Sequence, residues 1–394
     1  FSSAAAEAGA AAAIRSVCGD AGGTAALENS GIDPGLMLEA RNQASESFLT
    51  AVSLARVNLR RFHEYQRRQG YLHDNGDGAG LSRVVRPLSR IGICCGSSPA
   101  ALLMCAVPAQ VAGVGRIAVA AAADAAGKVD PALLAVARLL DLDEVYRLDG
   151  ALAAAALALG AGPIRRVDKV VGRLDAAGAA VGRMLSGQAG FAVSVGFGGL
   201  AVVADAGANA RFIASDLLAR AGMEGDPGPL ALFATDRWLA EAVRIEILRR
   251  LDAAAAGQAK RNLERAGGLF LCTGAEEAIG AVNLLAPSRL ELMTRDNQAC
   301  LADVENAGAV FLGPWSPDGA GDVFSCLGLG LPAAGAARFA SGIGVGDFVK
   351  EISVVECAPE RLLRARRHFQ ALLEGDPLGE VALRERLEML KAGW

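Results

Sequence analysis

The feature that most constrains the fold is a repeated alternation of short apolar runs with alanine-rich segments from Arg83 to about Gly313. Strands that alternate with helices in this way form parallel sheets with helices on both faces. Nine strands are too many for one such sheet, so the sequence predicts an α/β fold with two doubly wound units. The predicted strands are RIGICC, RIAVAA, EVYRLD, KVVG, FAVSV, LAVVAD, LALFATD, LFLC and AVFLG.

The two ends of the chain have a helical pattern instead. Residues 36–70 predict one or two long helices, because apolar and arginine positions interleave at roughly helical spacing. The stretch GYLHDNGDGAG that follows is dense in glycine and aspartate and predicts a loop. From Ser353 to the end, leucine and arginine again recur as in an amphipathic helix, which predicts a tail that packs on another element or another subunit.

Composition excludes several classes of protein. A net charge of −4 gives no electrostatic reason to expect nucleic acid or an anionic membrane as partner. The longest small-apolar run is interrupted by Pro108, Gln110 and Arg116, which predicts a helix and then a strand rather than a membrane span. The eight cysteines include no CxxC pair, so neither a disulfide framework nor a zinc finger is expected.

The compartment is predicted from the same features. Scattered cysteines in apolar runs are typical of a reducing compartment. The first residues are rich in serine and alanine and lack an initiator methionine. That beginning is what removal of a targeting peptide would leave, so an organelle, plastid or mitochondrion, is expected.

Six segments of the chain occur in a recognisable order. They are VVRPLSRIGICC, LLMCAVPAQVAGV, DEVYRLDGALAAAALALGAGPIRRVDKVVG, ANARFIASDLLARA, NAGAVFLGPWSP and AARFASGIGVGDFVKEISVV. Together they resemble the histidinol dehydrogenase family, and the likeness runs from about Ile14 to about Gly375. The resemblance implies two Rossmann-like units, one inserted in the other, with helical N- and C-terminal arms. It also implies a homodimer in which the C-terminal tail reaches the partner's site. The family oxidises an amino alcohol to an amino acid in two NAD-dependent hydride transfers, with zinc holding the substrate.

The resemblance gives the expected domain boundaries. Residues 1–91 are expected to form a helical arm and the start of the larger α/β domain, which residues 200–350 complete. Residues 92–199 are expected to form the inserted Rossmann-like domain. Residues 351–394 are then the helical tail that contacts the partner. No G-x-G-x-x-G and no P-loop occurs, so a dinucleotide would bind without a glycine-rich cradle.

The family's acid–base pair is changed in this sequence. The family carries Glu-His within a stretch like APEHLEL, where this chain has Ser288 and Arg289. Serine is far too weak a base alone, and arginine stays protonated. Glu291 remains, and in a helix it would face the same side as Ser288, either as a proton acceptor or as a salt-bridged surface carboxylate.

The zinc ligands implied by the resemblance are mostly changed as well. Arg220 stands at the position of the glutamine ligand, Asp322 matches the aspartate, and Val381 or Glu380 takes the place of the tail histidine. The family's substrate-contacting histidine falls on Leu329. One ligand of four is therefore retained, fewer than the three or so that a catalytic zinc site uses. Of the histidines, His368 is a candidate for a displaced ligand; the others are His63 and His73.

The segments that meet the dinucleotide and substrate in the family also differ. The GPGN turn has become Gly172-Arg173-Leu174-Asp175, and the GPSE loop has become Gly196-Phe197-Gly198-Gly199. A loop like PGGTAAYPSS is shortened to GSSPAA at residues 96–101. Lys350 does match a lysine of the family.

These changes lead to a first hypothesis of a catalytically inactive relative. Such a protein would need neither NAD nor zinc and would serve as a structural subunit, pairing with itself through the tail or with other subunits of a larger assembly. A conserved fold does not by itself imply a conserved activity.

Two alternatives keep a ligand. One is an NAD(P)-dependent oxidoreductase with zinc-independent chemistry, using Asp322, Asp175 or Glu291 as acid or base. The other is a non-enzyme that binds an anion in an arginine-lined cleft. In a third interpretation, each arginine fills vacated space and pairs with a nearby carboxylate. The residues of the hypothetical cleft are Arg173, Arg220, Arg289, Lys350 and Asp322.

Overall fold

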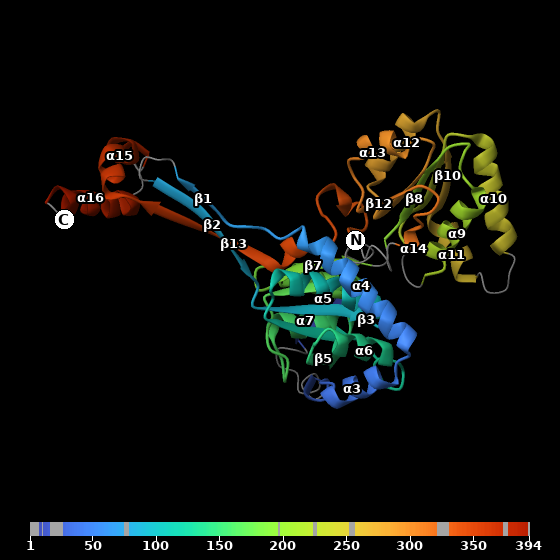
Figure 1. Ribbon diagram of the computed structural model, residues 1–394, viewed down its shortest axis with the longest axis horizontal. Coiled ribbons are helices and arrows are strands. Elements are labelled where there is room, and N and C mark those ends of the chain that lie inside the picture. Colours follow the sequence, from blue (N-terminus) through green and yellow to red (C-terminus); the bar gives the residue numbers. More distant parts are fainter. Residues whose placement is uncertain are drawn as a thin grey trace. The chain divides into compact units, whose positions relative to one another are not determined.

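The computed structural model divides the chain into two units (Figure 1). The first consists of Phe1–Gln66 and Leu88–Phe348, and the second of Arg67–Pro87 and Val349–Trp394. The first unit holds two five-stranded sheets and the second holds one three-stranded sheet. The structure describes residues 8–9, 11–15, 27–74, 79–195, 198–223, 227–251, 257–320, 331–372 and 377–392.

The first five-stranded sheet has the strand order β5-β4-β3-β6-β7, and all its neighbouring strands are parallel. Its central strand β3 is buried along Ile91–Cys95, as expected for a strand that is covered on both faces. The strands are β3 (Arg90–Gly96), β4 (Arg116–Ala121), β5 (Glu144–Arg147), β6 (Lys169–Leu174) and β7 (Gly190–Val195).

Helices cover both faces of this sheet. One core packs α5 and α6 against Ile91, Ile93 and Val119, and α3 and α4 add Met37 and Leu59 to it. A second core packs the alanine-rich α7 and α8 against the opposite face. The helices are α3 (Pro34–Gln43), α4 (Glu46–Glu64), α5 (Pro99–Ala112), α6 (Pro131–Leu139), α7 (Gly150–Leu159) and α8 (Ala176–Met184), with a 3-10 turn η3 at Val345–Phe348.

The second five-stranded sheet has the equivalent order β10-β9-β8-β11-β12 and is also entirely parallel. Helices α9, α10 and α11 cover one face, and α12 and α13 cover the other. The strands are β8 (Leu200–Ala204), β9 (Leu230–Ala234), β10 (Gly267–Leu271), β11 (Arg289–Met293) and β12 (Ala309–Leu312). The helices are α9 (Ala210–Ala221), α10 (Arg237–Leu251), α11 (Gly257–Ala266), α12 (Ala275–Leu285), α13 (Asn297–Ala302), the short α14 (Asp318–Ala320) and η2 (Ala336–Arg338).

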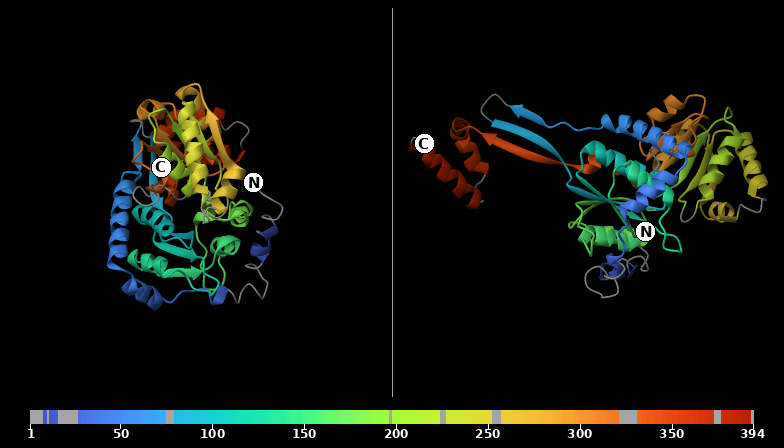
Figure 2. Two further views of the ribbon diagram at one scale, coloured as in Figure 1. Left: turned by 90° about the vertical axis from the view of Figure 1, so that its right-hand side faces the viewer. Right: turned by 60° about the horizontal axis from the view of Figure 1, so that its bottom comes forward.

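The second unit is an antiparallel ribbon followed by two helices (Figure 2). Strand β2 lies between β1 and β13, so segments about 270 residues apart in the chain pair along their whole length. Strand β13 is exposed from Lys350 to Cys357. The elements are β1 (Tyr71–Asp74), β2 (Ala79–Pro87), β13 (Val349–Cys357), α15 (Pro359–Leu372) and α16 (Pro377–Lys391).

The predicted fold class is confirmed: all nine expected runs are strands of two doubly wound parallel sheets. Two local predictions are wrong. Part of the expected loop at 70–80 pairs in the ribbon, and the first residues of the expected helical tail, Ser353–Cys357, belong to strand β13. Residues 289–293, for which a helix was considered, form strand β11 beside the central strand β8. The domain boundaries stay a prediction, as does the organelle. Among the described helices, none is long and apolar enough to span a bilayer, and the six cysteines of the described part are free thiols.

Candidate active site

Strand β11 brings charged side chains into the core of the second sheet. Leu290 and Leu292 pack in the core beneath α12, whereas Met293 packs in the core beneath α9. Because side chains alternate along a strand, Arg289 and Glu291 project to the α9 side. Both are almost fully buried, at 2% and 1% exposure.

Helix α9 supplies the groups that face this strand. Ile213 and Leu217 are buried in the sheet core. Asp216 and Arg220 are four residues apart and therefore lie on one face of the helix, beside these two residues. Asn209 caps the start of the helix by accepting a hydrogen bond from the N–H of Arg211 at 2.9 Å.

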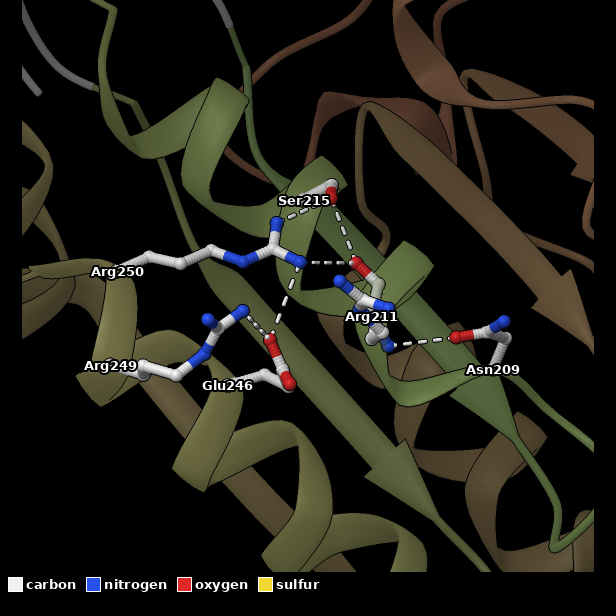
Figure 3. A network of polar contacts seen from close by, with 6 residues as sticks. All are labelled: Asn209, Arg211, Ser215, Glu246, Arg249 and Arg250. Atoms are coloured by element: carbon white, nitrogen blue, oxygen red, sulfur yellow. Dashed lines mark hydrogen bonds and ion pairs between the residues drawn. The ribbon is translucent and has the colours of Figure 1, made fainter.

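The outer surface of α9 is tied to α10 by a polar network (Figure 3). Arg250 donates to Ser215 Oγ at 2.6 Å and to the carbonyl of Arg211. Glu246 accepts from Arg250 and from Arg249. These contacts fix the helix that carries Asp216 and Arg220.

The buried charges converge on Asp318, at the start of α14. Arg220 donates from Nε to Asp318 Oδ2 at 2.8 Å and also contacts it through Nη2. Arg289 Nε lies 2.6 Å from Asp318 Oδ1 as an ion pair, without the alignment of a hydrogen bond. The Asp318 backbone N–H donates to Glu291 Oε1 at 2.7 Å. Asp216, Arg220, Arg289, Glu291 and Asp318 form what is called the charge cluster below.

The charge cluster holds protons near neutral pH. Burial, followed by repulsion from Asp216, raises the pKa of Glu291 to about 8. Burial and the nearby Asp318 raise the pKa of Asp216 to about 6. Among the described residues, Glu291 Oε2 has no hydrogen-bond partner, which suits a protonated carboxyl group better than a carboxylate.

Ser288 has a structural contact with the segment that resembles the family's substrate loop. Its Oγ donates to the carbonyl of Pro332 at 2.7 Å. A Cβ on Gly198 would lie 2.3 Å from the same Oγ, and Gly198 has φ +69°. Ser288 thus occupies the space that a side chain at position 198 would need, so the two changes compensate each other sterically.

The other candidate residues do not join the charge cluster within the described structure. Arg173 lies on β6 of the first sheet, where its Nη2 would be 3.7 Å from a Cβ on Gly96. Lys350 is on β13 and Val381 on α16, both exposed in the second unit. Asp322 and Leu329 lie outside the described residues.

The histidines do not form a site among the described residues. His63 is buried on α4, and its Nδ1 is 2.9 Å from Gln66 Oε1. His73 and His368 are exposed in the second unit. No three histidine, cysteine, aspartate or glutamate side chains of the described part gather where they could hold a metal ion.

Comparison with known proteins decides the family. The model of the family described as histidinol dehydrogenase matches residues 9–383. A histidinol dehydrogenase of Bacillus thuringiensis is 36% identical over 338 residues, 84% of this chain and 78% of that protein. One from Thermus thermophilus is 39% identical over 322 residues, covering 80% and 76%.

The chain belongs to the histidinol dehydrogenase family. The crystal structure of histidinol dehydrogenase from Elizabethkingia anophelis has the same fold, with a TM-score of 0.88 at 24% identity over 97% of this chain and 92% of that one.

The expectation of an inactive protein is contradicted by these relatives. Proteins that match over four fifths of the chain are named as the enzyme, and no observation shows that this member has lost activity. The expectation rested on the changed acid–base pair at Ser288 and Arg289, the changed zinc-ligand positions and the changed segments that meet the dinucleotide and substrate in the family. It did not consider Asp216 and Asp318, which the fold brings to Glu291.

The expectation that neither NAD nor zinc is used is contradicted in the same way, because the histidinol dehydrogenase family depends on both. The described residues nevertheless do not fit a zinc ion. They hold no suitable ligand group, and the guanidinium of Arg220, which cannot ligate a metal, is paired with Asp318. The chemistry that the charge cluster supports is proton exchange.

Asp216 and Asp318 are the residues that sequence reasoning missed. Asp318 lies in the segment PWSPDGA, four residues before Asp322, which matches a zinc ligand of the family. Asp216 stands four residues before Arg220 in a helical stretch. Helical spacing predicts that Asp216 lies on the same face as Arg220, so this residue could have been identified. Nothing in the sequence predicts that α14 packs against β11.

Proposed function

We propose that this protein is an NAD-dependent dehydrogenase that oxidises a histidinol-like amino alcohol. The observation that carries the proposal is the identity of 36–39% to histidinol dehydrogenases over at least 80% of the chain. A chain that had kept only the scaffold would have no reason to bury four ionisable side chains around the position of the family's acid–base pair.

The charge cluster provides the proton chemistry that alcohol oxidation needs. NAD, when bound, accepts the hydride, and the alcohol proton must go to a base of the protein. Asp216, with its pKa near 6, is mostly ionised at pH 7, whereas Glu291, with its pKa near 8, is mostly protonated. Two carboxyl groups whose pKa values lie on either side of neutrality can serve as base and acid.

The decisive experiment measures NADH formation by the purified protein with NAD and L-histidinol. It is carried out with added zinc and with a chelator. NADH formation in either condition supports the proposal. No formation in either condition, from a folded protein, contradicts it.

The role of the charge cluster is tested with Glu291→Gln. Loss of a positioned acid–base group is expected to lower the rate about a hundredfold. Glu276→Gln, on the exposed first turn of α12, is the matched control and is expected to keep the rate. Equal rates in both variants would remove Glu291 from the mechanism.

We also propose a homodimer formed through the second unit. A three-stranded ribbon needs a covered apolar face to be stable, yet Leu72 and Val355 are 71% and 73% exposed in the single chain. A second copy, as the family resemblance implies, would cover them. Val355→Arg is expected to shift the mass measured by light scattering from dimer to monomer. A monomeric parent protein would contradict the proposal.

A further inference from the structure

The outer edge of strand β10 is exposed and apolar. β10 is an edge strand of the second sheet, and among the described strands only β9 pairs with it. Leu269, Phe270 and Leu271 are 39%, 50% and 58% exposed. The strand GGLFL contains neither a charge nor a proline, the residues with which proteins usually protect an exposed edge. An edge of this kind pairs readily with another strand.

The equivalent strand of the first sheet shows how such an edge is covered. β5 has the same place in the strand order, and the segment 30–32 lies antiparallel beside it. The N–H of Ile32 donates to the carbonyl of Val145 at 2.9 Å, and the N–H of Arg147 donates to the carbonyl of Ser30 at 2.7 Å. No segment of the described chain makes such bonds to the outer edge of β10. The backbone groups of this edge are therefore available to a strand from another chain.

The side chains of β10 leave apolar area on both faces of the sheet. Phe270 stacks on Phe233 on the α12 side, with ring centroids 5.1 Å apart. A Cβ on Gly268 would lie 2.6 Å from the Phe270 ring, so the ring covers this glycine along the strand. Leu269 and Leu271 project to the opposite face. A strand that pairs here therefore buries apolar side chains as well as backbone groups.

The charges before and after β10 favour a particular partner. Helix α11, which precedes the strand, has the sequence GQAKRNLERA with three positive residues and one negative residue. Helix α12, which follows it, begins with Glu276 and Glu277. A second copy in antiparallel orientation brings the basic end of each strand to the acidic end of the other. A parallel copy would bring like charges together.

We propose that β10 pairs in antiparallel orientation with β10 of a second copy, so that the two second sheets form one continuous sheet. A two-fold axis at Leu269 pairs all five residues of each strand and puts Phe270 opposite Gly268 of the second copy. The contact is separate from the ribbon contact proposed above. Because so few residues pair, the dissociation constant is expected in the micromolar to millimolar range. The mass of dilute protein then still reports the ribbon contact alone.

The first test is cross-linking of the full-length Leu269→Cys variant with a short bis-maleimide. Directly opposite side chains of antiparallel strands have Cβ atoms roughly 4.5–5.5 Å apart, so the reagent should link two copies through this position. The exposed Cys357 is replaced by serine in every sample. Leu54→Cys, on α4 and more exposed at 62%, is the matched control and should give only single chains. A denaturing gel measures the fraction of doubled mass.

The second test is light scattering over a concentration series, which needs no added cysteine. The mass of the parent should rise with concentration. Leu271→Lys adds a charge to the edge and should weaken the association at least about tenfold. Leu271→Thr keeps a strand-forming residue at the same exposed position and should retain most of the rise. Glu276→Lys should weaken the association about threefold, because it puts a positive charge near the basic end of the second copy.

The outcomes decide both the contact and its geometry. Cross-linking at position 269 with a rise in mass that Leu271→Lys abolishes supports the pairing. A parent mass that does not change with concentration, with no more product at position 269 than in the control, overturns it. A rise that Leu271→Lys leaves unchanged places the association on another surface and also overturns it. A normal rise in Glu276→Lys overturns the antiparallel arrangement.

Discussion

The two five-stranded sheets share one strand order but differ in what their fourth strand carries. In the first sheet, β6 buries Val170 and Val171 next to the central strand. In the second, β11 takes the equivalent place beside β8 and buries Arg289 and Glu291. The ion pair of the first sheet, Arg90 with Glu144, is partly exposed at 12% and 28%, whereas the ion pairs of Arg220 and Arg289 with Asp318 are almost completely desolvated.

The difference indicates where function resides. Desolvation of an ion pair can cost as much as the attraction returns, and apolar replacements are often neutral or stabilising. The first sheet shows that this topology needs no fully buried charge in its fourth strand, because Lys169 and Arg173 of β6 are only half-buried. The charged residues of β11 are therefore better explained by chemistry than by stability, and each prediction below tests that contrast.

The largest effect is expected from Asp318→Asn. The change leaves the guanidiniums of Arg220 and Arg289 buried without their shared carboxylate. Loss of one partner from a buried ion cluster lowers the free energy of unfolding by roughly 3–5 kcal/mol. Glu144→Gln, the matched change in the first sheet, is expected to cost about 1 kcal/mol or less because its pair is partly solvated. Urea unfolding measures the free energy of unfolding of both variants. Equal losses in the two variants would contradict the difference between the two sheets.

The second effect concerns how stability changes with pH. The pKa of Glu291 is raised to about 8 from its ordinary 4.5, so the folded protein binds this proton more tightly than the unfolded chain. Stability from this group is then full below about pH 4.5 and is lost as the pH rises towards 8. The loss is on the order of a few kcal/mol.

Glu291→Gln replaces the carboxyl group by an amide that does not titrate, so the variant is expected to lack this dependence of stability on pH. The free energy of unfolding of the parent should fall relative to the variant between about pH 5 and pH 8, since only the parent must bury a developing charge. Urea unfolding at three pH values measures the difference. A constant difference across the range would show that Glu291 does not hold a proton.

The sequence predicted the sheets well and the site poorly, for a physical reason. Strands such as LAVVAD and RIAVAA are recognisable because apolar side chains must be buried on both faces of a parallel sheet. RLELM does not follow this pattern because it contains two charged residues. It was therefore not among the predicted strands, although it forms a buried strand. Its partners Asp216 and Asp318 come from segments 102 residues apart, and only the tertiary fold brings them together.

The smallest effect is expected beside the first sheet and with the opposite sign. His63 is buried against Gln66, which also accepts the N–H of Val345 at 3.0 Å. Burial lowers the pKa of His63, so the unfolded chain binds the proton more tightly. The stability that this group contributes is therefore full above about pH 6.5 and is lost as the pH falls.

His63→Leu should lower the free energy of unfolding by about 1 kcal/mol at pH 7.5 because a hydrogen bond is lost. The loss should be smaller at pH 5, where only the parent must release a proton on folding. A cost of His63→Leu that is larger at pH 5 than at pH 7.5 would show that His63 is charged in the folded protein. In that case, the pH response would not distinguish the helices on the first sheet from the charge cluster of the second.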